Sequence, residues 1–70
     1  MTITIQNLSA SIAADGCPAA ITDEAVREQI EQACAGGGVV TLVDAGDGSQ
    51  WHAEKRGADL WLEIASMPPA

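Results

Sequence analysis

The stretch VVTLVDAGDGSQWHAEKRGADLWLEIA, residues 39–65, decides the fold of this chain. It holds three runs rich in β-branched, aromatic and aliphatic residues, at positions 39–43, 50–54 and 60–65. Two clusters of glycine and charged residues separate the runs, at positions 44–49 and 55–58. Short runs bounded by such turn residues are typical of an antiparallel meander. We therefore expect three strands joined by two hairpin turns.

The length of the first turn predicts how its two strands pair. A four-residue loop at residues 45–48 places Leu42 opposite Trp51 and Val40 opposite Ala53. Because side chains alternate between the two faces of a strand, these four apolar residues share one face. The first hairpin is therefore expected to have one apolar side.

An even-numbered second turn around residues 56–57 continues this pattern. It places Ala53 opposite Leu60, and it also places Glu54 opposite Asp59, a like-charge pair that is unfavourable. We favour this register because it gathers the apolar side chains of all three strands on one face. These side chains are Val40, Leu42, Trp51, Ala53, Leu60, Leu62 and Ile64.

The opposite face of the predicted meander is mainly polar. It carries Val39, Thr41, Val43, Gln50, His52, Glu54, Asp59, Trp61 and Glu63. The position of Trp61 among carboxylates has two interpretations. Neighbouring side chains or the N-terminal segment partly cover it on a solvated face, or it is the centre of an acidic contact surface, since tryptophan is enriched at interface hot spots.

The N-terminal third of the chain is expected to add one strand to this sheet. Residues 2–6 alternate between polar and apolar and predict that strand. Residues 8–15 fit either a strand or hairpin arm, which we favour, or a short helix with Asn7 as its N-cap. A turn at residues 15–18 and a loop at residues 18–21 follow.

One amphipathic helix is predicted at residues 23–35. Thr22 is its expected N-cap, and the three glycines at residues 36–38 end it. One face carries an apolar stripe of Val26, Ile30, Ala33 and Cys34. The other face carries Glu24, Glu28 and Glu31.

These elements predict a small α+β domain over residues 1–70. Its antiparallel sheet consists of the three-stranded C-terminal meander plus the N-terminal strand, with one helix packed on one face. Residues 66–70 are expected to form a loose tail, because Pro68 and Pro69 cannot continue a strand. A domain this short buries only about 60% of its unfolded surface, so its stability is expected to be marginal.

The charge of the chain restricts its partners. Ten acidic residues against three basic ones give a formal net charge of -7. This charge argues against direct binding to nucleic acid or to an anionic membrane, where phosphates favour Lys and Arg. It favours a basic protein or nucleoprotein complex that associates rapidly and in a salt-sensitive manner.

Neither a signal peptide nor a membrane span is recognisable in the sequence, so we expect a cytoplasmic protein with reduced thiols. The alternative is a disulfide between the two cysteines. Cys17 and Cys34 lack the spacing of a redox or zinc motif. The segment at residues 44–48 is a poor calcium loop, because Gly46 and Gly48 stand where ligands are needed. His52 is the single histidine. The sequence therefore predicts a protein that is not an enzyme and has no cofactor or metal.

The carboxylates are spaced along rigid elements and one loop, where they can stand in for phosphates toward a DNA-binding protein. They are Glu24, Glu28 and Glu31 on the helix, Glu54, Asp59 and Glu63 on the sheet, and Asp44 and Asp47 in the first turn. The alternative is that an acidic surface confers solubility and needs no partner.

A very short, strongly acidic chain with one helix on a small sheet and no catalytic set resembles the phage-encoded anti-CRISPR proteins that inhibit type I interference complexes. The resemblance covers the whole chain and rests on size, charge, layout and the carboxylates above. It implies a DNA-mimic inhibitor that occupies a basic DNA-binding surface, without specifying the target. We expect a partner such as a CRISPR interference complex, with Trp61 as an apolar anchor of the contact. The alternative function is a structural or assembly module that forms a homodimer or subunit contact through the outer sheet face or an edge strand.

Overall fold

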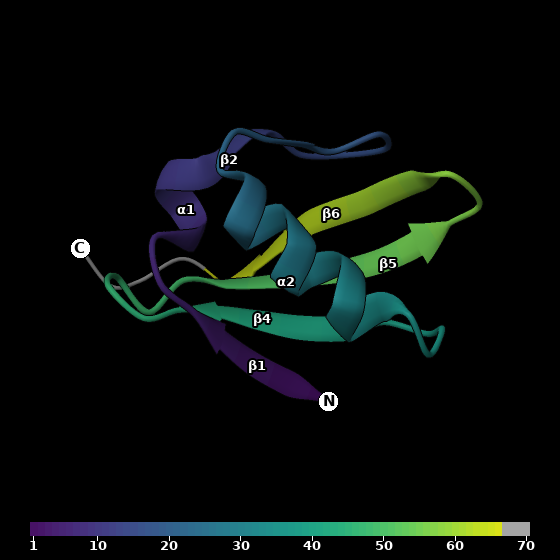
Figure 1. Cartoon of the computed structure of the whole chain (residues 1–70). Helices are drawn as coiled ribbons and strands as arrows, with labels where there is room; N and C mark the ends of the chain where they lie inside the picture. The colour runs from purple at the N-terminus through teal and green to yellow at the C-terminus, as the bar shows by residue number, and fades with distance from the viewer. Residues whose placement is uncertain (67–70) are drawn as a thin grey trace.

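The computed structural model describes residues 1–66 and has an α+β fold (Figure 1). Along the chain its elements are β1 (Thr2–Ile5), α1 (Leu8–Ser11), β2 (Ile12–Ala14), β3 (Ala20–Ile21), α2 (Glu24–Cys34), β4 (Val40–Asp44), β5 (Gln50–Arg56) and β6 (Asp59–Ser66). A four-stranded sheet has the order β1-β4-β5-β6, and β2 and β3 form a separate two-stranded sheet. The predicted α+β class is therefore confirmed, whereas the predicted single antiparallel sheet is wrong.

The sheet is mixed because β1 pairs with β4 in parallel. Parallel neighbours need a crossover connection, and here α1, β2, β3 and α2 all lie in the chain between the two strands. The prediction of an N-terminal strand at residues 2–6 is confirmed, but its direction relative to the meander could not follow from local pattern.

The first hairpin of the meander has the predicted register. Leu42 pairs with Trp51 and Val40 pairs with Ala53 across β4 and β5. The four-residue loop at residues 45–48 therefore fixes the apolar face of this hairpin as expected.

Strand β5 continues two residues further than predicted before the second hairpin turn. Arg56 pairs with Asp59, so only Gly57 and Ala58 form the turn, and Glu54 lies opposite Trp61 rather than opposite Asp59. Gly57 has a φ of 62°, a left-handed value that favours glycine in a two-residue hairpin turn. The shift removes the predicted like-charge pair. Because it is a shift by two residues, every side chain keeps its predicted face.

The segment before α2 combines both interpretations of residues 8–15. One helical turn forms at α1, where the backbone N–H and the Oγ of Ser11 both donate to the Asn7 carbonyl, at 3.1 and 2.7 Å. Asn7 adopts a left-handed conformation with a φ of 59°, and its side chain makes no capping hydrogen bond. From Ile12 the backbone is extended and forms β2. The favoured strand is thus correct for the second half of the segment only.

Helix α2 begins one residue later than predicted because Asp23, not Thr22, is its N-cap. The Asp23 carboxylate accepts hydrogen bonds from the backbone N–H groups of Ala25 and Val26, at 2.9 and 3.3 Å. Thr22 instead donates its hydroxyl to the Ser11 carbonyl at 3.1 Å, which ties the start of α2 to α1.

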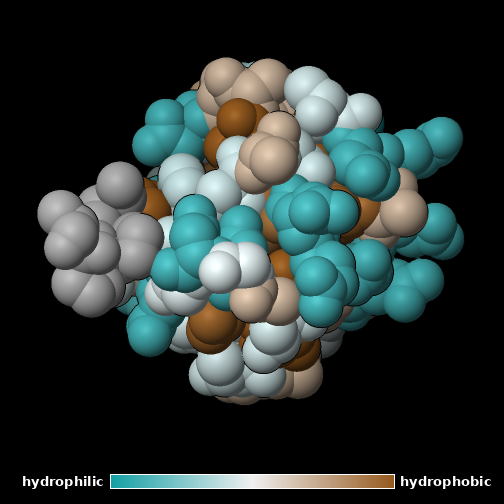
Figure 2. Space-filling view, turned by 90° about the vertical axis from the view of Figure 1, so that its left-hand side faces the viewer, coloured by the Kyte–Doolittle hydropathy of each residue, from teal (hydrophilic) through white to brown (hydrophobic). Residues whose placement is uncertain are grey.

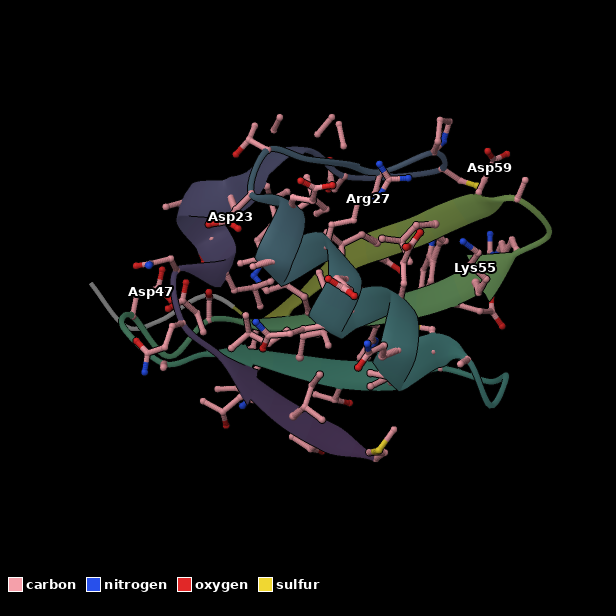
Figure 3. The ribbon with its side chains drawn as sticks, in the orientation of Figure 1. Asp23, Arg27, Asp47, Lys55 and Asp59 are labelled. Carbon is pink, nitrogen blue, oxygen red and sulfur yellow. The ribbon has the colours of Figure 1, made fainter. Side chains whose placement is uncertain are left out.

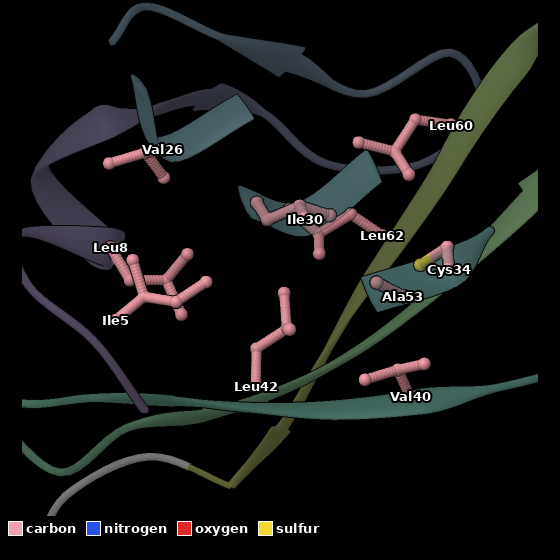
Figure 4. Close-up of a cluster of buried hydrophobic side chains, with 10 residues drawn as sticks. All are labelled: Ile5, Leu8, Val26, Ile30, Cys34, Val40, Leu42, Ala53, Leu60 and Leu62. Atoms are coloured by element: carbon pink, nitrogen blue, oxygen red, sulfur yellow. The ribbon is translucent and has the colours of Figure 1, made fainter. Parts of the chain in front are cut away.

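The core lies between α2 and one face of the four-stranded sheet (Figure 4). Its buried members are Ile5, Leu8, Val26, Ile30, Cys34, Val40, Leu42, Ala53, Leu60 and Leu62. The predicted apolar stripe of α2 is confirmed, with Ala33 at its margin. The apolar face of the meander is confirmed except for Ile64: Trp51 packs half-buried against the core, whereas Ile64 is half-buried and does not belong to the core cluster. The core thereby fixes which side of α2 faces solvent.

Two further predictions concern the ends of the chain and its surroundings. Ser66 belongs to β6, so the predicted tail does not begin there, and its remaining residues 67–70 lie outside the described part. Within residues 1–66 neither helix has the length and apolar character that a bilayer span requires.

Candidate functional site

The outer face of α2 presents carboxylates to solvent. Glu24 and Glu28 are exposed and lie one helical turn apart, while Glu31 is half-buried one turn further along. Together with Arg27 these residues line a shallow depression on the surface of the helix. The three glutamates predicted for this face are therefore brought together by the structure.

Glu31 forms ion pairs with two basic side chains, Arg27 and Lys55. Its Oε1 lies 3.1 Å from Lys55 Nζ and 3.7 Å from Arg27 Nε. The hydrogen bond from Lys55, then the Lys55 charge, and more weakly Arg27, lower the pKa of Glu31 below its ordinary value. Lys55 belongs to the end of β5, so this contact also ties the sheet to the helix (Figure 3).

The third basic side chain is occupied on the other face of the sheet. Arg56 Nε lies 2.7 Å from Glu54 Oε1, and its guanidinium stacks over the Trp61 ring at 4.5 Å from the centroid. Trp61 is half-buried. The partial cover of Trp61 expected from neighbouring side chains is thus supplied by Arg56.

All three basic residues of the chain therefore contact carboxylates, which leaves the excess of acid unneutralised. Exposed carboxylates that make no ion pair within residues 1–66 include Asp15, Glu24, Glu28, Asp59 and Glu63. The surface thus carries a net negative charge.

The carboxylates predicted to act together lie on two opposite surfaces. Leu60 and Leu62 point from β6 into the core beneath α2, so Asp59 and Glu63, which alternate with them, point to the other side of the sheet. Glu54 follows Ala53 in the same way. The sheet set and the helix set therefore cannot engage one flat partner surface at the same time.

Asp44 is not available to a partner, contrary to its predicted role. Only 5% of its surface is exposed, and its Oδ2 accepts the Ser9 backbone N–H at 2.7 Å. Its Oδ1 accepts the N–H groups of Gly46 and Asp47 at 2.6 and 3.3 Å. Asp44 therefore holds the first turn together and joins it to α1.

Asp47 completes this polar cluster and is likewise engaged within the turn. Its Oδ1 accepts both the backbone N–H and the hydroxyl of Ser49, at 2.8 and 2.7 Å. The Ser49 hydroxyl oxygen in turn accepts the Trp51 indole N–H at 3.3 Å and lies 2.7 Å from the Ser9 hydroxyl. Sequence analysis missed the contact between Ser9 and Ser49, because these two residues lie 40 positions apart along the chain.

The donors in this cluster favour the ionised form of both aspartates. The Ser9 N–H is the largest cause that lowers the pKa of Asp44 from its ordinary 3.8; burial opposes it, and the Gly46 N–H adds to it. The Ser49 hydroxyl and N–H lower the pKa of Asp47 in the same direction. The hydrogen bonds of this cluster therefore stabilise the fold while both aspartates are ionised.

Acid should weaken the fold through this cluster. A carboxyl whose folded pKa lies below its unfolded pKa stabilises the fold above the unfolded value, and this stabilisation is lost as the pH falls through the folded value. We expect the free energy of unfolding to fall as the pH drops below the ordinary aspartate pKa of 3.8. Urea unfolding at several pH values should show a smaller fall for Asp44→Asn than for Asp59→Asn. Equal pH profiles for the two variants would contradict the assignment.

The remaining reactive side chains are dispersed. His52 is half-buried on the outer sheet face, Cys17 is exposed and Cys34 is buried, and both cysteines are free thiols. Burial is the largest cause that raises the pKa of the Cys34 thiol. Within residues 1–66 no three His, Cys, Asp or Glu side chains gather as metal ligands.

Comparison with protein-family models, with curated protein sequences and with solved structures gives no significant match to this chain.

Proposed function

We propose that this protein is a non-enzymatic binding inhibitor whose acidic α2 face engages a basic, nucleic-acid-binding surface of another protein or complex. The observation that supports it best is the pair Glu24 and Glu28. Both are exposed on a helix held rigidly by its buried face, and the basic residue between them, Arg27, is already directed to Glu31.

The physical argument is one of charge and geometry. Carboxylates accept paired hydrogen bonds from arginine as phosphates do, so a row of them on a rigid helix suits a groove that binds nucleic acid. A net charge of -7 steers such a partner toward the protein from a distance. The contact should therefore form rapidly and weaken as salt rises.

The resemblance to anti-CRISPR proteins in size, charge and layout suggests a first partner to test. A CRISPR interference complex holds nucleic acid in positively charged channels, and an acidic helix would compete for such a channel. Trp61 lies on the sheet face opposite α2 and beneath Arg56, so we do not assign it as the apolar anchor of this contact.

The test compares two variants that remove the same number of charges. Glu24→Gln with Glu28→Gln alters the helix face and leaves the ion pairs of Glu31 in place. Asp59→Asn with Glu63→Gln removes two exposed charges from the other side of the sheet. We expect the helix variant to bind a captured partner about tenfold or more weakly at low salt, and the sheet variant to bind nearly as the parent does.

The partner is to be captured from a host lysate at low salt, eluted at high salt, and challenged with duplex DNA. Displacement by DNA together with a selective loss in the helix variant supports the proposal. Equal weakening in both variants would show that net charge alone causes binding, and binding that resists salt and DNA would overturn the proposal.

A further inference from the structure

Strand β1 leaves one edge of the four-stranded sheet open. It is the terminal strand in the order β1-β4-β5-β6, and no described residue pairs with its outer side (Figure 1). The carbonyls of Met1 and Ile5 accept hydrogen bonds from the N–H groups of Thr41 in β4 and of Ala45, the residue directly after β4. Because pairing groups alternate along a strand, the N–H and C=O of Thr2 and Thr4 point outward.

The opposite edge of the sheet, formed by β6, is partly covered by another segment of the chain. There Gly16 exchanges two hydrogen bonds with Leu62 of β6, at 2.7 and 2.9 Å, and the Ala19 N–H donates to the Leu60 carbonyl at 2.7 Å. The loop before β3 thus covers the middle of the β6 edge. Proteins usually shield an edge strand with lysine, proline, a bulge or such a cover, and β1, with the sequence TITI, has none of these.

The side chains along β1 are uncharged in a strongly acidic protein. No charged side chain occurs before Asp15, and the neighbouring residues 39–43 are also uncharged. Asp44, which lies beside the end of β1, is buried and directed to its own hydrogen bonds. In Figure 2 the lower end, where β1 lies, is mainly white, tan and brown, and most of the teal surface lies at mid-height and to the right.

We propose that β1 is a self-association edge, where a second copy of this chain adds its own β1 in antiparallel orientation to form a continuous eight-stranded sheet. Most of the other surface would bring unpaired carboxylates of two copies together, whereas this edge would not. A basic peptide would find no exposed carboxylate along β1 to bind. The neutral edge therefore fits an identical neutral edge.

The alternation of pairing groups suggests the register. A closed dimer with a twofold axis pairs β1 with its antiparallel copy, and centring the axis at Ile3 places Thr2 of each copy opposite Thr4 of the other. Ile3 is half-buried at the margin of the core, so its remaining exposed surface would pack against the second Ile3. Four backbone hydrogen bonds would form between the threonines of the two copies.

This dimer would place both α2 helices on the same side of the joined sheet, since the twofold axis is perpendicular to it. The acidic face described above would thereby be doubled. The dimer does not depend on that function, however, because its contacts are made by β1 alone. A partner that fails to bind would leave the self-association unaffected.

The first experiment measures mass in solution by analytical ultracentrifugation over about 10 µM to 1 mM of protein. We expect a dimer whose fraction rises with concentration. Thr4→Pro removes an outward N–H without touching the bonds to β4, and it should weaken the dimer about tenfold or more. The matched control Thr4→Ala keeps that N–H and should dimerise like the parent. Circular dichroism checks that both variants are folded.

A cross-link tests the register even if the proline variant is unfolded. In a Cys17→Ser background, Ile3→Cys places two thiols across the axis at a Cα separation of about 4.5 Å, suitable for a disulfide. Thr4→Cys in the same background lies opposite Thr2 and should cross-link poorly. A monomer at every concentration, or stronger cross-linking by Thr4→Cys than by Ile3→Cys, would overturn the proposed dimer.

Discussion

Replacing Asp44 with alanine is expected to lower the free energy of unfolding by about 3 kcal/mol, a large part of the total stability of a 70-residue domain. The substitution leaves the N–H groups of Ser9 and Gly46 without the acceptors that they now reach at 2.7 and 2.6 Å. The same change opens the first turn of the meander and releases α1 from it. Urea unfolding at neutral pH measures the effect.

Two matched variants separate this explanation from a simple change of charge. Asp44→Asn keeps one acceptor oxygen and should lose less stability than Asp44→Ala, about 1–2 kcal/mol. Asp59→Ala removes an exposed aspartate and should change stability by no more than about 0.5 kcal/mol. A similar midpoint for Asp44→Ala and Asp59→Ala would show that the buried carboxylate does not hold the turn.

The role of Asp44 also shows where reading of the sequence alone reached its limit. In turns, an aspartate often accepts hydrogen bonds from the backbone N–H groups two and three residues further on, as Asp44 does from Gly46 and Asp47. The sequence of the turn was sufficient to suggest these two bonds. The bond to Ser9 was not predictable, because it spans 35 residues and depends on where α1 lies. An acidic loop was therefore interpreted as surface when its first carboxylate belongs to the interior.

Local rules predicted the parts of the fold that depend on neighbouring residues. The loop at residues 45–48 fixed one hairpin register, and the alternation of faces survived an error of two residues at Gly57. The parallel pairing of β1 with β4 was missed, since nothing within either strand encodes the direction of a partner 39 residues away. Ile3, for example, pairs with Leu42 only because the crossover brings the two strands together.

The candidate site was predicted only in part for the same reason. The i, i+4 spacing of Glu24 and Glu28 was sufficient to place them on one helix face. Whether that face and the outer sheet face form one surface depends on the layer order, which places the sheet between them. The hydrogen bond of Lys55 to Glu31 likewise required the end of β5 to reach the end of α2.

Ile30→Ala is expected to have the largest effect of any substitution considered, lowering the free energy of unfolding by about 4 kcal/mol. Ile30 is fully buried at the middle of α2, between the helix and the sheet (Figure 4). An isolated helix of 11 residues is marginal in water, so α2 depends on this packing to remain helical. The carboxylates of Glu24 and Glu28 are held one turn apart only while it does.

A graded series on α2 distinguishes packing from helix propensity. Ile30→Val removes one methylene and should cost about 1 kcal/mol, whereas Ile30→Ala should leave much of the protein unfolded at room temperature. Gln29→Ala, at an exposed position of the same helix, should leave stability unchanged or slightly raise it, since alanine favours helix. Thermal unfolding followed by far-UV circular dichroism at about 222 nm, where the helical signal is strong, measures all three variants. If Ile30→Ala and Gln29→Ala unfold at the same temperature, α2 does not depend on its buried face. The proposed inhibitor function would then lose its structural basis, because it rests on a rigid acidic helix.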